Sequence, residues 1–313
     1  MTCNLCSSET NKIISTKARL ETHNIIQCPE CGLVYIDLQK TNEELELWHR
    51  TEYRKNPALH IQTAEQHYND QVTRKDVKSQ FEYISKNISI IGKRILEIGS
   101  ASGGLLELLN NNGARASGLE INNEYRRYCQ NKGLDVSDTP VELHKQKYDL
   151  IIAFHVLEHF TNPMKSIRGI FTCLKSSGAF MGEVPNQNEW GLSIFNSEII
   201  KQLHYNPHVH YFYFTTSTLN KYFEKTGFRE MRFETVERYN SLAQLRIILG
   251  GGDISKILIP EVTEEDLRLR IGGREEQEFN RVFSKAVNME LKGDCLRFIA
   301  RIDAHETHPT KGL

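Results

Sequence analysis

Short apolar runs alternate with amphipathic stretches through the middle of the chain. Ile95, Leu96 and Ile98 form one such run, and residues 148–155 (Y-D-L-I-I-A-F-H) form a longer one. Short apolar runs next to glycine or polar residues are typical of buried parallel strands. Helical spacing of apolar residues follows the runs, beginning at Leu105 and again over residues 165–174. The pattern predicts alternating strands and helices, and therefore a doubly wound α/β sheet.

The flanks of this alternating region are predicted to be rich in helix. Residues 41–91 form a helical linker region in this interpretation, because apolar residues recur at helical spacing from Tyr68 to Ile88. Towards the C-terminus, strands are expected over residues 227–236 and 295–302, with a helical insertion over about 238–293 between them. A structureless loop of that length is uncommon in a compact domain. The insertion is interpreted as a lid or a partner-binding surface, with homodimer formation as one role for it.

Four of the seven cysteines, Cys3, Cys6, Cys28 and Cys31, fall at the start of the chain and form two C-x-x-C pairs. Two residues between thiolates let a tight turn aim both sulfurs at one ion, so the pairs predict a tetrahedral structural Zn²⁺ site. A hairpin would fill the gap between the pairs. A disulfide is disfavoured in a chain with cytosolic features, and neither pair opens the βαβ unit expected of a redox motif. Residues 1–40 are therefore expected to form a zinc ribbon.

A glycine-rich turn connects the first central strand to the helix after it. Gly99 to Gly104 (G-S-A-S-G-G) form this turn, and Glu120 ends the next apparent strand, 21 residues past Gly99. This order of strand, glycine turn, helix, strand and carboxylate is typical of the start of a nucleotide-binding fold. In that fold the carboxylate accepts hydrogen bonds from a ribose diol. The G-x-G-x-x-G spacing of pyrophosphate-binding dehydrogenases is not matched. Instead, Glu97 stands two residues before Gly99, which suits a ligand with an ammonium group.

The stretch E-x-G-x-A-x-G from Glu97 to Gly103 resembles motif I of the class I S-adenosylmethionine-dependent methyltransferases, with Ala101 in place of the usual middle glycine. The residues Y-D-L-I-I and H-V-L-E-H over 148–159 resemble the fourth strand and following turn of the same superfamily. The resemblance covers residues 92 to about 235. It implies a Rossmann-like seven-stranded sheet in a methyltransferase domain over residues 92–313. The residues implied to bind S-adenosylmethionine are Glu97, Gly99, Ser100, Ala101, Ser102, Gly103, Glu120, Ile121, Asp138, Phe154 and His155.

The N-terminal ribbon adds a second resemblance, to the sugar C-methyltransferases, although those proteins are longer and carry a further C-terminal domain. The implied acceptor is a small molecule, such as a sugar, a nucleotide-sugar or a glycan-related metabolite, methylated on oxygen or carbon. Two alternatives stay open. One is an RNA or protein methyltransferase docked by the ribbon, and the other is a non-catalytic, cofactor-binding scaffold.

Histidines are the candidates for a general base, because methyl transfer often requires removal of a proton. His155 ends the fourth strand, at the edge that faces ligands in doubly wound sheets, and a cofactor contact is an equal alternative for it. His208 and His210 lie in the aromatic segment N-P-H-V-H-Y-F-Y-F, and an extended backbone would put both on one face. Packing of the aromatic residues, with the histidines exposed, is the other interpretation. A metal site formed by His155, His159, His208 and His210 lacks a supporting motif.

Composition narrows the class of protein without identifying the acceptor. The 39 Lys and Arg residues balance 40 Asp and Glu residues, so the net charge of −1 gives no sign of a nucleic-acid partner. No secretory signal and no run of about 20 apolar residues is visible, which favours a cytoplasmic protein with no membrane partner.

Overall fold

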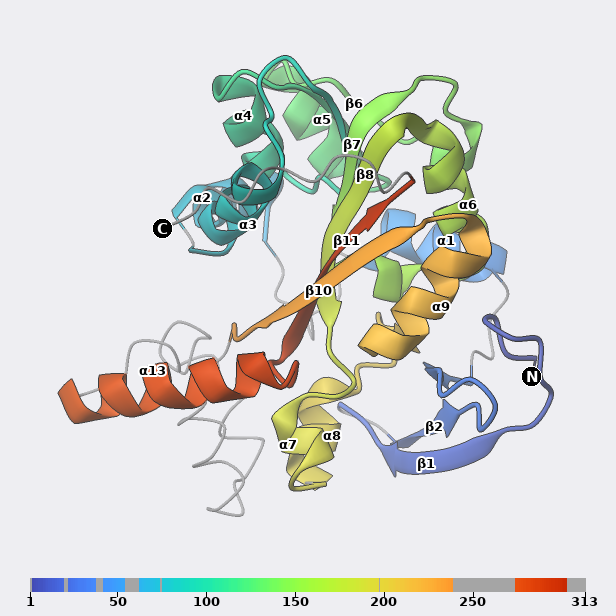
Figure 1. Ribbon diagram of the computed structural model, residues 1–313. Helices are drawn as coiled ribbons and strands as arrows, with labels where there is room; N and C mark the ends of the chain where they lie inside the picture. The colour runs from blue at the N-terminus through green and yellow to red at the C-terminus, as the bar shows by residue number, and fades with distance from the viewer. Residues whose placement is uncertain are drawn as a thin grey trace. The chain divides into compact units, whose positions relative to one another are not determined.

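The computed structural model describes residues 2–19, 22–37, 42–53, 62–73, 75–196, 198–238 and 274–302 of the 313. A seven-stranded sheet runs through the middle of the chain, in the order β10-β11-β8-β7-β4-β5-β6 (Figure 1). Its strands are β4 (Arg94–Ile98), β5 (Arg115–Leu119), β6 (Val136–Ser137), β7 (Tyr148–Phe154), β8 (Leu174–Pro185), β10 (Glu230–Val236) and β11 (Cys295–Arg301). The doubly wound, seven-stranded fold expected from the sequence is confirmed.

The central strands are parallel and in register at their carboxyl ends. β4 pairs in parallel with both β5 and β7, and Ile98 is the partner of Leu119 on one side and of Ala153 on the other. The three strands therefore end at one edge of the sheet, where the chain continues as Gly99, Glu120 and His155. In open α/β sheets this edge is where ligands bind.

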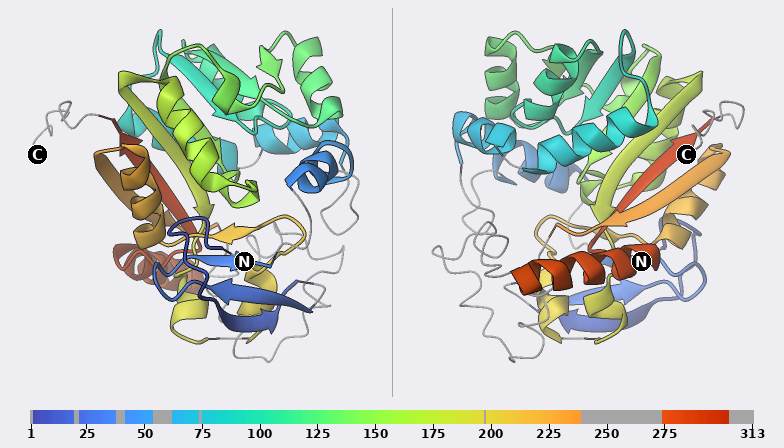
Figure 2. Two further views of the ribbon diagram at one scale, coloured as in Figure 1. Left: turned by 90° about the vertical axis from the view of Figure 1, so that its right-hand side faces the viewer. Right: turned by 60° about the vertical axis from the view of Figure 1, so that its left-hand side comes forward.

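Helices cover both faces of the sheet. α3 (Lys75–Asn87) and α4 (Gly104–Asn111) lie on one face and α6 (Pro163–Cys173) on the other (Figures 1 and 2). Isoleucine and leucine side chains between these layers are fully buried, including those of Ile84, Leu106 and Ile152. The remaining helices of this part are α1 (Asn42–Thr51), α2 (Ala64–Thr73), α5 (Asn123–Asn131) and α9 (Thr216–Thr226).

Asparagine side chains fix the first turns of two helices. The Asn122 side chain accepts hydrogen bonds from the Glu124 and Tyr125 amides at the start of α5, and Asn162 accepts one from the Lys165 amide at the start of α6. Pro163 follows Asn162 as the first residue of α6, a position that needs no amide hydrogen bond. These caps satisfy amides that a helix leaves unpaired at its N-terminus.

A second, four-stranded sheet has the order β1-β2-β3-β9. Its strands are β1 (Lys12–Lys17), β2 (Thr22–Gln27), β3 (Val34–Ile36) and β9 (Phe212–Tyr213). The first two form the expected hairpin, and the neighbouring strands pair antiparallel throughout. The addition of β9, from a segment nearly 180 residues further along, was not anticipated from the sequence.

The chain divides into two compact units, each built from three segments. The ribbon unit comprises Met1–Asp37, Glu183–Leu219 and Phe233–Arg297, and it includes α7 (Trp190–Ser193), α8 (Glu198–His204) and α13 (Arg274–Met289). The sheet unit comprises Leu38–Gly182, Asn220–Arg232 and Phe298–Leu313. Of the helical insertion predicted over 238–293, residues 274–289 form α13, and residues 239–273 lie outside the described residues.

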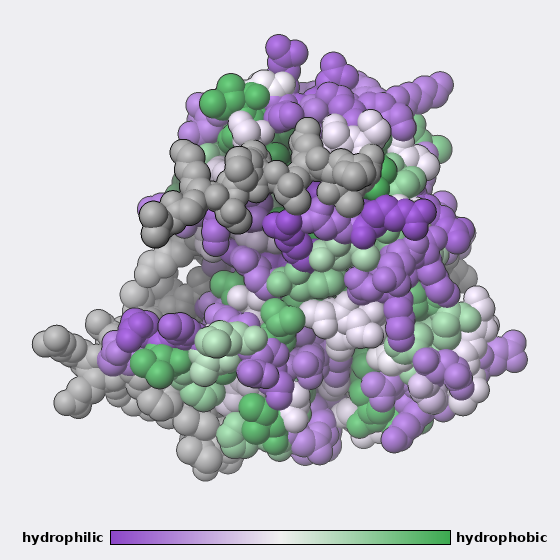
Figure 3. All heavy atoms as spheres, in the orientation of Figure 1, coloured by the Kyte–Doolittle hydropathy of each residue, from purple (hydrophilic) through white to green (hydrophobic). Residues whose placement is uncertain are grey.

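Hydrophilic and hydrophobic residues alternate in small patches on the face drawn in Figure 3. Among the described residues, no helix combines the length and apolar character needed to cross a bilayer.

Candidate cofactor site and cysteine cluster

The glycine-rich turn after β4 owes its shape to left-handed backbone at alternate positions. Gly99, Ala101 and Gly103 have φ angles of 72°, 48° and 85°. A Cβ atom on Gly99 would lie 2.5 Å from Cγ2 of Val156, and one on Gly103 would lie 2.6 Å from Cδ1 of Leu134. The left-handed conformation therefore favours glycine at both positions, and at Gly99 the stiff, β-branched side chain of Val156 also leaves no space for a Cβ atom. Alanine at the middle position keeps the left-handed conformation at a cost of about 1–2 kcal/mol.

Glu120 anchors this turn from the end of the neighbouring strand. Its Oε2 accepts a hydrogen bond from the Ala101 amide at 2.9 Å, and its Oε1 accepts one from the Asn122 amide at 2.7 Å. The carboxylate is thereby held in a fixed orientation at the carboxyl edge of the sheet. Each of its oxygens still has a lone pair with which to accept a hydroxyl hydrogen. This arrangement fits the ribose diol of a nucleoside ligand.

Glu97 places a second carboxyl group at the same edge. It is 7% exposed, and its Oε2 has no hydrogen-bond partner among the described residues. Burial raises the pKa of Glu97 well above the ordinary value, and the neighbouring Glu120 carboxylate raises it further. A buried carboxylate without a partner is costly, and a ligand ammonium would supply the missing charge. The amino acid portion of S-adenosylmethionine carries such an ammonium, so the residues present fit this cofactor.

Helix α2 packs its polar side against the glycine-rich turn. Ser102 Oγ donates a hydrogen bond to Gln71 Oε1 at 2.7 Å, and the Gly104 amide donates to the same oxygen at 3.2 Å. His67 Nδ1 lies 2.7 Å from Ser102 Oγ. Because the single hydroxyl hydrogen of Ser102 goes to Gln71, the imidazole of His67 donates here. The sequence interpretation missed Gln71 and His67, although their spacing of four residues on one helix was a usable signal.

The other residues implied to bind the cofactor differ in their surroundings. Asp138, just after β6, has its Oδ2 3.1 Å from Arg50 Nη1 and 3.5 Å from Arg126 Nη2. Ser100 Oγ is buried and has no hydrogen-bond partner among the described residues. Ile121 follows Glu120 in the chain and is partly buried. Their roles in binding stay predictions.

His155 follows β7 directly and adopts a left-handed backbone with φ 55°. Phe154, the last residue of β7, is partly buried against the core of the sheet. The Nδ1 atom of His155 lies 3.4 Å from Oε1 of Glu158, whose side chain is 1% exposed. The sheet unit thus brings a histidine and a buried carboxylate together at the edge that also carries Glu97 and Glu120.

His208 and His210 belong to the ribbon unit and lie in a turn. The Asn206 carbonyl accepts hydrogen bonds from the Val209 amide at 3.1 Å and from the His210 amide at 2.8 Å. The backbone is therefore not extended at His208, because these two hydrogen bonds close a turn before β9 begins. The two histidines accordingly do not alternate along a strand, and their assignment as bases stays a prediction.

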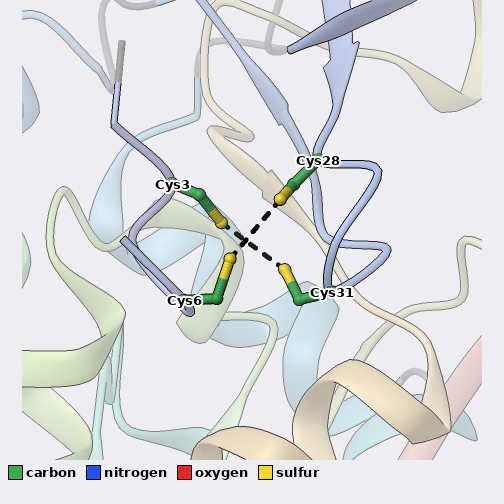
Figure 4. A group of neighbouring side chains, drawn as sticks. All are labelled: Cys3, Cys6, Cys28 and Cys31. Carbon is green, nitrogen blue, oxygen red and sulfur yellow. Dashed lines mark hydrogen bonds between the residues drawn. The ribbon is translucent and has the colours of Figure 1, made fainter. Parts of the chain in front are cut away.

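The four N-terminal cysteines converge on one point (Figure 4). Cys3 Sγ lies 3.5 Å from Cys31 Sγ, Cys6 Sγ lies 3.5 Å from Cys28 Sγ, and all four sulfurs are within 4.8 Å of one another. Four sulfurs at about 2.3 Å from one tetrahedral ion would be roughly 3.8 Å apart. The cluster therefore has the dimensions of a tetrathiolate metal site, and none of the cysteines is in a disulfide.

The two turns that present the cysteines have the same backbone geometry. The Ser7 amide donates to the Cys3 carbonyl at 2.9 Å, and the Gly32 amide donates to the Cys28 carbonyl at 2.9 Å. Ser7 and Gly32 both have positive φ angles, of 63° and 83°. Two equivalent turns facing each other supply the paired thiolates that a closed zinc site needs.

Together, the sheet order, the glycine-rich turn and the two carboxylates at its edge define a class I S-adenosylmethionine-dependent methyltransferase. The chain belongs to the methyltransferase-domain family, whose model, described as "Methyltransferase domain", matches residues 65–231. The matched range runs from α2 to the first residues of β10 and includes every residue that was implied to bind the cofactor.

Curated relatives and solved structures agree with this class. The chain is 24% identical over 160 residues to a ubiquinone biosynthesis O-methyltransferase of Photorhabdus laumondii, covering 47% of this chain and 67% of the relative. It is 24% identical to the protein of the same name from Marinobacter nauticus, over 60% of this chain and 84% of that one. The structure of a phosphoethanolamine N-methyltransferase 2 from Haemonchus contortus has a TM-score of 0.50 and 13% identity, covering 86% of this chain and 62% of that one. At that identity the structural likeness extends to the fold alone.

Proposed function

We propose that the protein transfers a methyl group from S-adenosylmethionine to a small-molecule acceptor. The observation that carries this proposal is the pair of buried carboxylates at the sheet edge. Oε2 of Glu97 has no hydrogen-bond partner within the described part of the chain, and Glu120 is fixed against the glycine-rich turn. Glu97 would hold the ammonium of the cofactor and Glu120 its ribose hydroxyls, with the backbone from Gly99 to Gly103 beneath. When bound, S-adenosylmethionine supplies an electrophilic methyl group.

The acceptor in this proposal is a small organic molecule with a hydroxyl group. Its support is the set of relatives at 24% identity named as O-methyltransferases of ubiquinone biosynthesis. A sugar hydroxyl or carbon is the narrower hypothesis suggested by the cysteine ribbon, and it has no support from these relatives.

His155 is our first candidate for the general base, with His208 and His210 as the others. The support for His155 is its place directly after β7 and the buried Glu158 carboxylate 3.4 Å from its Nδ1. A carboxylate at that position would keep the proton on Nδ1, so that the lone pair able to accept a proton is on Nε2, as in other histidine bases.

We also propose that Cys3, Cys6, Cys28 and Cys31 bind one structural Zn²⁺ ion. The support is the mutual distance of the four sulfurs and the two matching turns. With four protein ligands, such a site has no open position and takes no part in methyl transfer.

The test of the function uses S-adenosylmethionine with a labelled methyl group and a panel of hydroxylated aromatics and nucleotide-sugars. We expect label on one member of the panel, and a loss of about 10²–10⁴-fold in turnover for His155→Asn if this residue is the base. Cofactor binding, measured in parallel by calorimetry, separates loss of chemistry from loss of the cofactor. Label appearing only on RNA or on protein would contradict the small-molecule acceptor.

A further inference from the structure

The short strand β9 joins the segment that carries His208 and His210 to the cysteine ribbon. By cysteine ribbon we mean the N-terminal part of the chain that holds the four clustered cysteines and strands β1, β2 and β3. Tyr35 of β3 is paired with Phe212, and Val34 with Tyr213. The Ile36 amide extends this pairing by donating a hydrogen bond to the Tyr211 carbonyl at 3.1 Å. The end of the histidine segment is therefore bound to the ribbon through its backbone.

The start of the same segment is bound to the ribbon as well. The Arg19 amide, two residues after β1, donates to the Tyr205 carbonyl at 2.8 Å. The segment is then closed on itself, since the Asn206 amide donates to the hydroxyl of Tyr213 at 2.9 Å. Residues 205–213 thus form a closed loop with both ends held by backbone hydrogen bonds to the ribbon.

The cysteine cluster is the part of the ribbon that orients β3. The Cys28 amide donates to the Leu33 carbonyl at 2.9 Å, so the second cysteine turn leads straight into β3 at Val34. A module of fewer than about 40 residues generally needs a metal or another cross-link to fold. Release of the ion would therefore free the edge on which β9 lies.

We propose that the cysteine ribbon is a positioning element for the histidine segment. The metal fixes β3, β3 fixes β9, and β9 with Arg19 fixes the turn that presents His208 and His210. This inference rests on the zinc site of the proposed function. It goes beyond that proposal because it gives the metal a defined effect on residues more than 170 positions away in the chain. An independent docking module would have no such effect.

Hydrogen exchange of the full-length protein, before and after removal of zinc with a chelator, tests the coupling. We expect exchange to rise by at least about tenfold in peptides covering 204–214, because loss of the β3 edge opens their hydrogen bonds. Exchange should stay unchanged in peptides covering 95–130, and so should calorimetric binding of S-adenosylhomocysteine. Cys6→Ser should behave like the chelated protein, whereas Cys173→Ser, at a buried cysteine of the sheet unit, should behave like the native one.

Ile36→Pro breaks the coupling without altering a cysteine, because proline lacks the amide that binds Tyr211. We expect this variant to keep one zinc per chain, measured by elemental analysis, and still to show raised exchange over 204–214. Zinc present in the native protein with unchanged exchange after chelation, or unchanged exchange in Ile36→Pro, would overturn the coupling alone. Absence of stoichiometric zinc from the purified protein would overturn the zinc site itself.

Discussion

Glu97 is the residue on which the cofactor assignment depends most. Two carboxyl groups at one sheet edge repel each other, and one of them has no partner among the described residues. The raised pKa of Glu97 means that this group holds a proton in the free protein at pH values where an exposed carboxyl would not. A cationic ligand would lower the pKa of Glu97, because its ammonium stabilises the ionised form of the carboxyl group.

Cofactor affinity should therefore rise with pH. Between the ordinary carboxyl value of 4.5 and the raised pKa, binding of the ammonium must release the proton from Glu97, so affinity increases by up to tenfold per pH unit. Calorimetry with S-adenosylhomocysteine from about pH 5 to about pH 8 measures this dependence. In Glu97→Gln the affinity should be lower and the slope should disappear. A native protein whose affinity is flat over this range would show that Glu97 is not the ammonium partner.

Gly99 is a position at which the addition of one carbon atom is expected to affect both stability and cofactor binding. Gly99→Ala places a Cβ 2.5 Å from Val156 in a left-handed backbone, so it adds a collision to conformational strain. Gly133 has a similar φ of 79° but nothing within 4 Å of the added atom, which makes Gly133→Ala a matched control. Both should lose about 1–2 kcal/mol in denaturant unfolding from the left-handed conformation. Only Gly99→Ala should lose more than that and also weaken cofactor binding, and equal behaviour of the two variants would contradict this account.

At the scale of elements, local pattern was enough for the alternating core and for the glycine-rich turn. β4 and β7 lie where the apolar runs predicted them, because buried parallel strands need continuous apolar residues. Boundaries were less exact, since β10 begins at Glu230 while the sequence placed this strand from residue 227. β9 was missed altogether, because a strand of two residues exists only through its partner β3.

Helix α2 shows a further limit of sequence reasoning. Polar residues such as Gln71 and His67 on an amphipathic helix are usually assigned to the solvent side, whereas here they contact the buried Ser102. Their partner lies more than 30 residues away, and only the fold brings the two together. The result is that a segment interpreted as a linker supports the glycine-rich turn.

Gln71→Ala tests this support. The change removes the acceptor of both the Ser102 hydroxyl and the Gly104 amide, and a buried donor without a partner costs about 1–3 kcal/mol. We expect S-adenosylhomocysteine to bind roughly tenfold more weakly by calorimetry. Gln66→Ala, on the same helix, is the control and should bind normally, because the Gln66 side chain accepts a hydrogen bond from the Thr63 amide and does not contact the glycine-rich turn in any described interaction. Normal binding by Gln71→Ala would mean that α2 has no part in shaping the turn.

At the scale of the whole molecule, the chain combines two units that are stabilised in different ways. The sheet unit contains the glycine-rich turn, both carboxylates and His155, and its core is built from apolar side chains of strands and helices. The ribbon unit contains the four cysteines and the histidine segment, and it draws on three distant parts of the chain. Composition and spacing identified the cysteine cluster, but only the structure shows that its strands are hydrogen-bonded to residues 205–213.

Titration of S-adenosylmethionine into the full-length protein tests the central claim most directly. The account predicts one site per chain, with binding weakened by about 1.5–3 kcal/mol in Glu120→Ala, the loss typical of hydrogen bonds to a charged group. Glu124→Gln, which changes a neighbouring carboxylate bonded to the Ala64 amide, should bind nearly as the native protein does. Absence of binding, unchanged affinity in Glu120→Ala, or tighter binding of a nicotinamide dinucleotide than of S-adenosylmethionine would contradict it.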